Sequence, residues 1–473
     1  MGESASAEPA DGDGDAASST AASVIAIAAD GDIILDVTFE TSKETLKKLR
    51  AQLKSMSLAA RSKNEPKTPA STRLELAYRV SSEALKKHSN YFANLLSNPQ
   101  FSEHRRLTDT HAALIARGIQ PAEAEAAELP RVEIVDDDQA TQASGREVAF
   151  KDMLLMLHKL PISVTKLTMS YMTTLAIMAD RFDCAATVAK SAGLGAKFKG
   201  PVTSTRAYFD EHGRATETEN VLRQKLLISI LLGQPTQLAA ASRELILRGS
   251  AIWNVYHEPE EGKDAAWWHL PEGIEDELRY RRECILNTVA SVQRHFLNLY
   301  SSRERQCKLG YDSSSACDSF QLGQMVKFLS SKSLLFLMDY SPSSLDSAPD
   351  ATCIDIQELL ATLRQCPSYQ LDKNHTNCGL RIRIEPILDY LRTMLSTNVI
   401  SIPLVEWRRN SENVKWQNDA EGGDSTRDKP KREFLFTRAV ANDQRLRYEG
   451  AMYVDKAAKS LFTSETWHWT PEV

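Results

Sequence analysis

Three cysteines and one histidine in the second half of the chain are the residues whose types and spacing best suit chemistry. Cys307 and Cys317 flank a loop that contains Gly310 and serines, and His375 and Cys378 form a short H-x-x-C knuckle with turn residues around it. Zn²⁺ takes four thiolate or imidazole ligands at tetrahedral positions, and three thiolates with one imidazole complete a closed structural site. The set therefore predicts one structural zinc, without the open coordination position of a catalytic metal.

A second explanation fits the same four residues. Free cysteines are small and often buried in intracellular proteins, and His375 can form its hydrogen bonds locally. The gap between the first two cysteines is longer than in common zinc modules. Other cysteines occur without any such context, namely Cys284, Cys353 and Cys366. The pattern alone leaves both explanations open.

Motifs for catalysis are weak along the chain. Gly193-Leu194-Gly195 with Gly200 lacks the G-x-G-x-x-G spacing of a dinucleotide site, and His257-Glu258 has no second histidine four residues after the first. Asp136–Asp138 is interpreted as a solvated turn at the end of a strand. We therefore expect a protein that is not an enzyme; an enzyme with a fold that these motifs do not identify is the remaining alternative.

Each of two basic segments has one interpretation as a functional site and one as an ordinary structural feature. Residues 427–432 (Arg-Asp-Lys-Pro-Lys-Arg) fit either a nuclear-import peptide or a solvated loop. Trp407-Arg408-Arg409 with Trp416 fits a nucleic-acid surface, but cation–π packing is the favoured interpretation. A nuclear role predicts that nuclear accumulation disappears when Lys429, Lys431 and Arg432 are replaced.

Composition narrows the class of protein. The 473 residues include 57 basic and 63 acidic side chains, a net charge of −6, which argues against direct binding of nucleic acid by the whole surface. Seven cysteines do not fit a complete disulfide framework. Residues 1–42 contain no Lys or Arg, so we expect no secretory leader. The sequence has no uninterrupted apolar window of about 18 residues, so we expect no membrane span. These features predict an intracellular protein, nuclear or cytoplasmic, with no membrane partner.

The N-terminal third shows strands first and then strands alternating with helices. After a tail over residues 1–28, whose Ala-, Ser- and acid-rich composition predicts disorder, Ile33–Phe39, Arg73–Val80 and Arg131–Val135 are predicted strands. A first helix is expected over 40–57. A second is expected to begin at Ser81 and to carry an apolar stripe of Leu85, Phe92 and Leu95-Leu96. Two more are expected around Phe150–Leu157 and Tyr171–Ala179. The stretch 103–128 is polar and Ala-rich. The pattern indicates an α+β fold with a helical majority.

Four pieces of this region resemble a BTB/POZ domain of the divergent fungal type. Gly31–Leu35 is similar to the family's opening "D-V-x-L" strand. Tyr78–Leu85 followed by Ser89–Phe92 is similar to its strand-to-helix signature, "F-x-A-H-K-x-V-L…S-x-x-F". Phe150–Leu157 and Leu175–Cys184 resemble its later helices, the latter close to "L-x-x-A-D-K-Y-x-C". The resemblance covers about residues 31–190, roughly a third of the chain.

The departures from the family pattern limit what the resemblance implies. The family's buried histidine and basic residue fall at Ser81 and Ser82, whereas the acidic position is kept as Asp32. The charged pocket of metazoan members is therefore incomplete, which weakens an inference of repressor-peptide binding. Two stretches, 40–72 and 103–129, are longer than the compact pattern. The resemblance implies protein partners, a homodimer, or a role as substrate adaptor on a cullin-type ubiquitin-ligase scaffold.

The remaining two thirds are predicted to be mainly helical. Domains are assigned to residues 29–190 (BTB/POZ-like), 191–300 (helical) and 301–473 (mixed, mainly helical, with a flexible loop near 418–431). Helices are expected over Leu222–Leu231, Leu238–Ile252, Glu275–Leu299, Leu322–Leu329, Ile354–Leu363 and Ile387–Leu395. Trp267-Trp268 is expected to pack one helical unit on another.

The combined prediction is a non-enzymatic protein-interaction module that self-associates or acts as an adaptor through its BTB/POZ-like part. The alternative is a nuclear regulator of transcription or chromatin that dimerises through that part and carries a structural zinc. Apart from this zinc, no cofactor is expected.

Overall fold

The computed structural model is mixed α/β and mostly helical, in agreement with the predicted α+β class. It describes residues 24–47, 49–50, 72–191, 198, 200–208, 216–253, 265–271, 273–307, 309, 314–334, 354–376, 378–396, 400–410, 435–436 and 468–469. These residues form two compact units, one within 1–138 and 157–160 and the other within 139–156 and 161–473. Residues 139–156 and 161–190 therefore group with the helical part, and the domain boundary expected at residue 190 stays a prediction.

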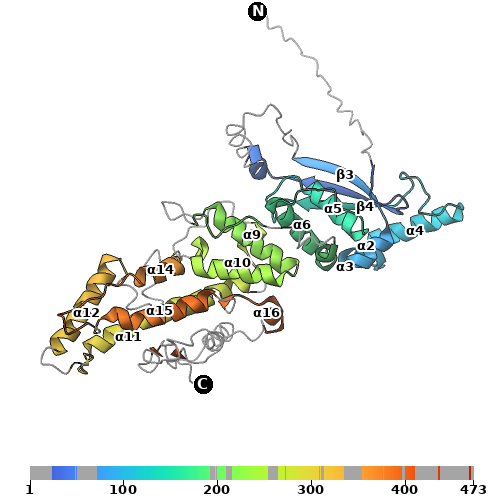
Figure 1. Cartoon of the computed structure of the whole chain (residues 1–473). Helices are drawn as coiled ribbons and strands as arrows, with labels where there is room; N and C mark the ends of the chain where they lie inside the picture. Colours follow the sequence, from blue (N-terminus) through green and yellow to red (C-terminus); the bar gives the residue numbers. More distant parts are fainter. Residues whose placement is uncertain are drawn as a thin grey trace, which may run out of the picture. The chain divides into compact units, whose positions relative to one another are not determined.

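The first unit is built on a four-stranded sheet (Figure 1). Its strands are β1 (Val24–Ala26), β2 (Ile33–Glu40), β3 (Arg73–Val80) and β4 (Arg131–Asp137). Their order is β1-β3-β2-β4, with β2 and β3 antiparallel and both outer strands parallel to their neighbours. The three longer strands confirm the sequence prediction. The expectation that the disordered tail extends to residue 28 was wrong, because residues 24–26 pair with β3.

The two faces of the sheet differ in burial. On one face the side chains of β2 are buried and apolar, as at Leu35 and Val37, which lie beside Val132 and Ile134 of β4. On the other face Ile34 packs in a small apolar cluster that includes Leu114, and the other residues of β2 on this face are polar. This alternation is the period of two that the sequence pattern indicated.

Two short helices follow β3 where the sequence indicated one apolar stripe. The helix α2 (Ser82–His88) follows Ser81, the predicted start, whose side chain accepts a hydrogen bond from Ala84 N. Ser89 then has an extended backbone, ends α2 and caps α3 (Asn90–Ser97) by accepting from Phe92 N at 3.1 Å. A serine at this position favours a cap over a helix interior, because its hydroxyl competes for backbone donors.

Phe92 gives a direct test of this packing. Its side chain is fully buried, at 0% exposure, whereas Tyr91 beside it on α3 is 38% exposed. Phe92→Ala is expected to lower the free energy of unfolding by about 3–5 kcal/mol, since it removes a buried ring and leaves a cavity. Chemical unfolding followed by circular dichroism measures the loss, with Tyr91→Ala as the control of smaller effect. Near-neutral unfolding of Phe92→Ala would contradict the assigned core.

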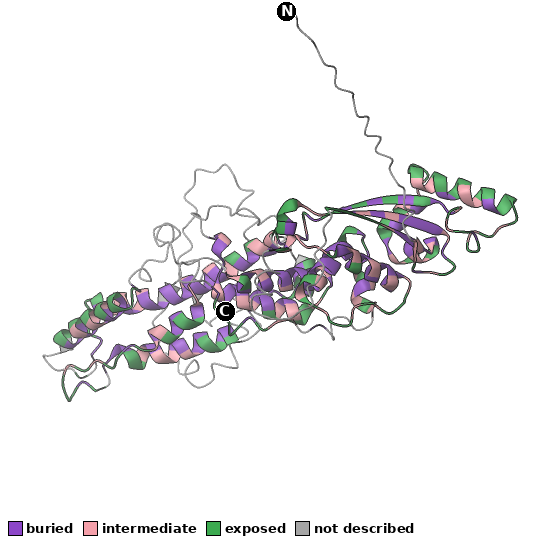
Figure 2. Ribbon diagram, turned by 90° about the horizontal axis from the view of Figure 1, so that it is seen from above, coloured by how far each residue is buried: buried purple, intermediate pink, exposed green. Residues whose placement is uncertain are grey.

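The polar, Ala-rich stretch after α3 forms a helix that the sequence analysis did not identify. This helix, α4, spans Ser102–Ala116, and only Leu107 and Leu114 on it are buried. Two apolar positions a full seven residues apart give too little periodicity to mark a helix. Figure 2 shows the result as a helix with mostly exposed residues. Of the helix expected over 40–57, residues 43–47 and 49–50 are helical, and 51–57 lie outside the described residues.

The second unit is formed mainly by helices. They are α5 (Arg146–Leu157, whose last residue groups with the first unit), α6 (Met169–Arg181), α7 (Ala185–Lys190), α9 (Glu217–Leu231), α10 (Pro235–Arg248), α11 (Ile274–Ser301), α12 (Ser314–Ser331), α14 (Ile356–Leu363), α15 (Leu380–Ser396) and α16 (Leu404–Asn410). Two 3₁₀ turns, η2 (Ala251–Trp253) and η3 (Ala266–Trp268), and a parallel pair of two-residue strands, β5 (Leu435–Phe436) and β6 (His468–Trp469), complete it.

One continuous apolar core holds the helices from α9 to α16 together. It includes fully buried side chains of α9, α10 and α11, such as Leu226, Leu245 and Leu278, and Trp267 of η3 packs in it. The predicted packing role of this tryptophan is confirmed. The helix expected over Leu238–Ile252 ends earlier, at Arg248, because Gly249 has a φ of 82° that other residues rarely adopt.

Candidate metal centre

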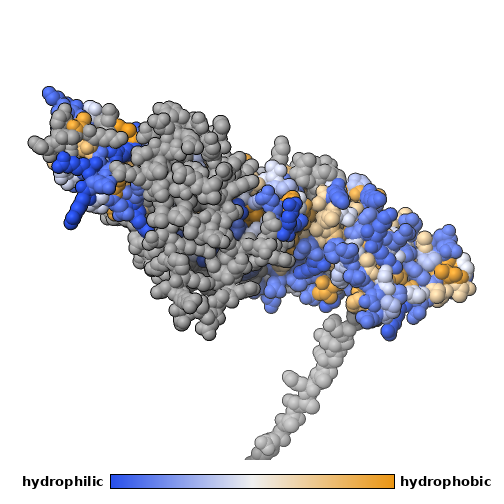
Figure 3. All heavy atoms as spheres, turned by 90° about the horizontal axis from the view of Figure 1, so that it is seen from below, coloured by the Kyte–Doolittle hydropathy of each residue, from blue (hydrophilic) through white to orange (hydrophobic). Residues whose placement is uncertain are grey.

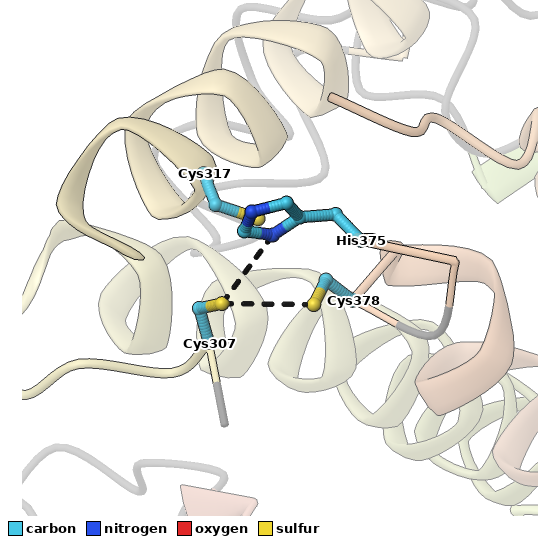
Figure 4. Close-up of side chains that lie close together, drawn as sticks. All are labelled: Cys307, Cys317, His375 and Cys378. Carbon is cyan, nitrogen blue, oxygen red and sulfur yellow. Dashed lines mark hydrogen bonds between the residues drawn. The ribbon is translucent and has the colours of Figure 1, made fainter. Parts of the chain in front are cut away.

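The four residues predicted as zinc ligands lie together in the second unit (Figure 4). Cys307 follows α11, Cys317 lies in the first turn of α12, and His375 and Cys378 lie in the turn before α15. All four are buried, and their donor atoms lie within 4.8 Å of one another. The fold thus brings together two pairs that are far apart in the sequence.

The two distances from Cys307 match the edges of a tetrahedron around a zinc ion. Cys307 Sγ is 3.4 Å from His375 Nδ1 and 3.7 Å from Cys378 Sγ. With Zn–S near 2.3 Å and Zn–N near 2.0 Å, tetrahedral angles place two sulfurs about 3.8 Å apart and a sulfur and a nitrogen about 3.5 Å apart. The remaining donor–donor separations in the set, those of Cys317 included, are all within 4.8 Å.

The carboxylate of Asp318 fixes the loop that carries Cys307. It accepts hydrogen bonds from the backbone N–H of Gln306 at 2.7 Å and of Cys307 at 3.0 Å. Because Asp318 directly follows Cys317 in α12, one side chain holds the first cysteine against the turn of the second. The sequence analysis missed this residue, and its position next to Cys317 was the only available signal.

A tight turn brings His375 and Cys378 to the same place. His375 N donates to the carbonyl of Asp372 at 3.1 Å, and Cys378 N donates to the carbonyl of His375 at 3.4 Å. A Cβ on Gly379 would lie 3.0 Å from the carbonyl oxygen of Tyr369. Glycine therefore lets the chain pass close to this backbone as it enters α15.

Polar side chains of α11 and α12 hold this turn in position. Gln321 donates from Nε2 to the carbonyl of Tyr369 at 3.0 Å and accepts through Oε1 from Leu380 N at 3.3 Å. The hydroxyl of Tyr300 donates to the carbonyl of Cys378 at 3.4 Å. A site supported in this way is preorganised, because its ligands keep their positions through bonds to other elements.

Burial and the neighbouring sulfurs decide the protonation of the thiols. Burial, together with Cys378 and Cys307, raises the pKa of Cys317 to about 12, and burial together with Cys307 also raises the pKa of Cys378. Without a metal these thiols are protonated at neutral pH. A metal ion must displace the protons, so its binding releases protons and weakens as the pH falls.

Asp372 supplies a carboxylate on the far side of the imidazole. Its Oδ2 lies 3.8 Å from His375 Nε2, while His375 Nδ1 points to Cys307. A metal-bound histidine commonly donates its other ring N–H to such a group, which fixes the ring and strengthens it as a ligand. The explanation that His375 bonds only locally therefore does not describe the site, since its Nδ1 meets a cysteine 68 residues away in sequence.

This buried cluster has the donors and the spacing to hold a metal ion. Three sulfurs and one nitrogen fill a tetrahedral set, so no protein-derived position is left open for water or substrate. The chemistry that this arrangement supports is structural: a bound ion would tie the end of α11, the start of α12 and the start of α15 to one point.

The other residues considered from sequence have different environments. Asp136 and Asp138 are buried, and Asp138 accepts from the N–H and the hydroxyl of Ser42, both at 3.0 Å. Their interpretation as a solvated turn was wrong, because β4 continues through Asp136. Trp407 is buried in the core, and Arg408 donates to the carbonyl of Ile230 at 2.9 Å, so this pair supports packing.

Several candidates lie outside the described residues. They are the glycine pair 193–195, the His257-Glu258 pair, Cys353, Trp416, the loop 418–431 and the basic segment 427–432.

Comparison with known proteins gives no assignment for this chain. No family model matches it, and neither a curated protein nor a solved structure does. Among the helices of the described segments, none is both long and apolar enough to cross a membrane. Function is therefore inferred from the residues and geometry described above.

Proposed function

We propose that the chain is a non-enzymatic protein-interaction protein. Its N-terminal part would self-associate or dock a partner as a BTB/POZ-like domain, and its helical unit would present a second binding surface held by a structural zinc. In support of the BTB/POZ-like interpretation, the strands β2 and β3, the helix pair α2–α3, and then β4, α5 and α6 follow in the order in which the resembling segments were placed.

The buried Cys307, Cys317, His375 and Cys378 cluster is the observation that carries the proposal. Zinc is favoured over harder divalent ions because three of the donors are thiols, which calcium and magnesium do not select. A closed site of this kind contributes folding energy to the segments that it joins. The helical unit is thereby suited to present a fixed surface to a partner.

Metal content gives the first test of this proposal. Protein purified without added metal is expected to contain about one zinc per chain, measured by inductively coupled plasma mass spectrometry. Cys378→Ala is expected to contain far less. Cys366→Ala, which removes a buried thiol outside the cluster, is the matched control and should retain the zinc. A content well below one per chain in the unaltered protein would contradict the zinc assignment.

Recovery of partners tests the interaction function. Full-length protein used as bait in native extract should retain specific proteins. Those bound through the helical unit should be lost after treatment with a zinc chelator. A cullin scaffold recovered with and without the chelator would identify the adaptor role of the N-terminal part. A bait that recovers no specific protein and remains monomeric would contradict the proposed function.

A further inference from the structure

The strand β4 forms one edge of the four-stranded sheet. Within the described residues it pairs with β2 alone, in parallel, with Val132 beside Leu35 and Ile134 beside Val37. In a parallel pair, alternate residues of a strand direct both backbone groups to the same neighbour. Ile34 N donates to the carbonyl of Pro130, so the even-numbered residues of β4 bond to β2. The odd-numbered residues direct their N–H and C=O outward.

The outward-bonding residues of β4 are also its exposed ones. Arg131, Glu133, Val135 and Asp137 are exposed, whereas the residues between them are buried, and Val135 is 65% exposed. Glu133 and Val135 have no backbone hydrogen bond on this outer side within the part of the chain that the structure describes. Such an edge is a template for a further strand.

The sequence of β4 selects one register for pairing with a copy of itself. In an antiparallel pair, residues that exchange both backbone bonds must bond outward on both strands, so odd residues face odd residues. A pair centred on Glu133 sets this residue against its own copy, and a pair centred on Val135 sets Glu133 against Asp137. Both registers place like charges opposite each other. A pair centred on Val132 sets Arg131 against Glu133 but overlaps over residues 131–133 alone, whereas a pair centred on Ile134 avoids both like-charge contacts and uses the whole of β4. It joins Arg131 to Asp137 of the second copy and Glu133 to Val135.

We infer that β4 pairs antiparallel with β4 of a second copy of this chain, about a twofold axis at Ile134. The two sheets join into one, with an Arg131–Asp137 ion pair at each end of the junction. Arg131 already contacts Asp36 of its own sheet through one nitrogen at 2.8 Å, and its remaining guanidinium donors can reach a second carboxylate. This assignment deepens the proposed self-association and rests on that function.

Of the residues that β4 exposes, Val135 is the only apolar one, so a backbone edge contact suits this strand better than a broad apolar contact. On the face shown in Figure 3, the hydrophobic residues of the described surface lie singly or in small groups among hydrophilic ones, with one group at the right-hand end, where α4 lies. Ile115 on α4 is 56% exposed. Backbone hydrogen bonds between the two β4 strands can hold two copies together without an apolar patch. The charged side chains then fix the register of the two strands.

Opposite charges at Val135 test this register. In the dimer Val135 faces Glu133 of the second copy, so Val135→Lys should tighten the dimer and Val135→Glu should loosen it. Each change acts at two symmetry-related pairs, which predicts a shift of roughly 2- to 30-fold in the dissociation constant in each direction. Sedimentation velocity of the full-length chain over a series of concentrations measures both shifts against the unaltered protein. Because Val135 is exposed, neither change should disturb the monomer.

A second pair of variants tests the backbone. Glu133→Pro removes an N–H that faces outward and spares the bonds to β2, so it should abolish the dimer. Glu133→Ala keeps this N–H and removes a carboxylate, so its dimer should be no weaker than the original. Circular dichroism of each variant confirms that the sheet is retained.

The outcomes separate this inference from the proposed function. Equal responses to lysine and glutamate at position 135, or a dimer unaffected by Glu133→Pro, overturn the β4 pairing while self-association through another surface stands. A monomer in every variant, lysine included, also overturns it. If specific partners are still recovered in native extract in that case, the proposed interaction function survives without the dimer.

Discussion

Cys378→Ala is expected to abolish metal binding and to lower the free energy of unfolding of the helical unit by more than about 4 kcal/mol. Losses of this size come from a few causes, and the loss of a structural metal is one of them. Cys378 contributes one of three sulfurs, and its Sγ lies 3.7 Å from that of Cys307. Two thiols and one imidazole cannot close the tetrahedron, so the segments before α12 and α15 lose their common anchor.

The matched control is Cys366→Ala. Cys366 is as buried as the ligands, at 1% exposure, but lies outside the cluster. Its replacement removes a buried sulfur without touching the metal, so the loss should be about 0.5–3 kcal/mol and the zinc content should not change. Denaturant unfolding followed by circular dichroism, with zinc measured on the same samples, separates the two effects. Equal losses for both variants would show that Cys378 acts as an ordinary core residue.

The pH dependence has opposite signs with and without the metal. With zinc bound, the ligand thiols are deprotonated, so stability from the metal is present near neutral pH and is lost as the pH falls and protons compete. In the metal-free chain the pKa of Cys317 is raised to about 12. Its contribution to stability is therefore present below the unfolded pKa and lost as the pH rises through about 12. Zinc release to a coloured chelator over a series of acidic pH values measures the first effect.

The elements that the sequence predicted are those whose apolar residues follow a single period. The alternation in β2, β3 and β4 and the long apolar stripe of α11 gave their positions within a few residues. The helix α4 has two buried residues, and Ser89 divides an apparent single helix by capping its second half. Burial of Asp136 and Asp138 was missed because a run of acidic residues is expected to be solvated. A carboxylate is buried where tertiary partners donate hydrogen bonds to it, as Ser42 does to Asp138.

The ligand set was predictable because cysteine and histidine are the residue types that most often bind zinc. The sequence could not show that the two pairs meet, since this depends on the packing of α11, α12 and α15. It also could not identify Asp318 or Gln321, whose roles arise from hydrogen bonds to backbone groups of other segments. Residue type gives the donors, whereas tertiary contacts give the supporting shell.

A second large effect is expected at Arg223, which the sequence analysis did not single out. This guanidinium is fully buried in the helical unit, with side-chain exposures of 0% for Arg223 and Glu219 and 21% for Glu275. It donates to Glu219 at 3.1 Å, to both oxygens of Glu275 at 3.0 and 2.9 Å, and to Ser250 at 2.7 Å. In sequence, Glu219 and Arg223 resemble an ordinary solvent-exposed i,i+4 pair.

The network keeps Arg223 charged inside the core. Burial alone lowers the pKa of this guanidinium, but the carboxylates of Glu275 and Glu219 outweigh it and raise the pKa overall. The guanidinium also lies over the ring of Trp268, 5.0 Å from its centroid. One side chain thereby joins α9, η3, the turn before η2 and the first turn of α11.

Arg223→Ala is expected to lower the free energy of unfolding by about 3–5 kcal/mol, because it leaves the carboxylate of Glu219 buried without its counter-charge. Arg364→Ala removes a guanidinium that is 38% exposed and pairs with Asp389 in the same unit, and should cost no more than about 1 kcal/mol. The double variant Glu219→Gln with Arg223→Met leaves no fully buried carboxylate without a counter-charge, because the remaining partner, Glu275, is 21% exposed. Its loss should therefore be smaller than that of Arg223→Ala alone. If the double variant is instead the less stable of the two, stability comes from attraction within the pair, and the cost of an unpaired buried carboxylate is not the cause.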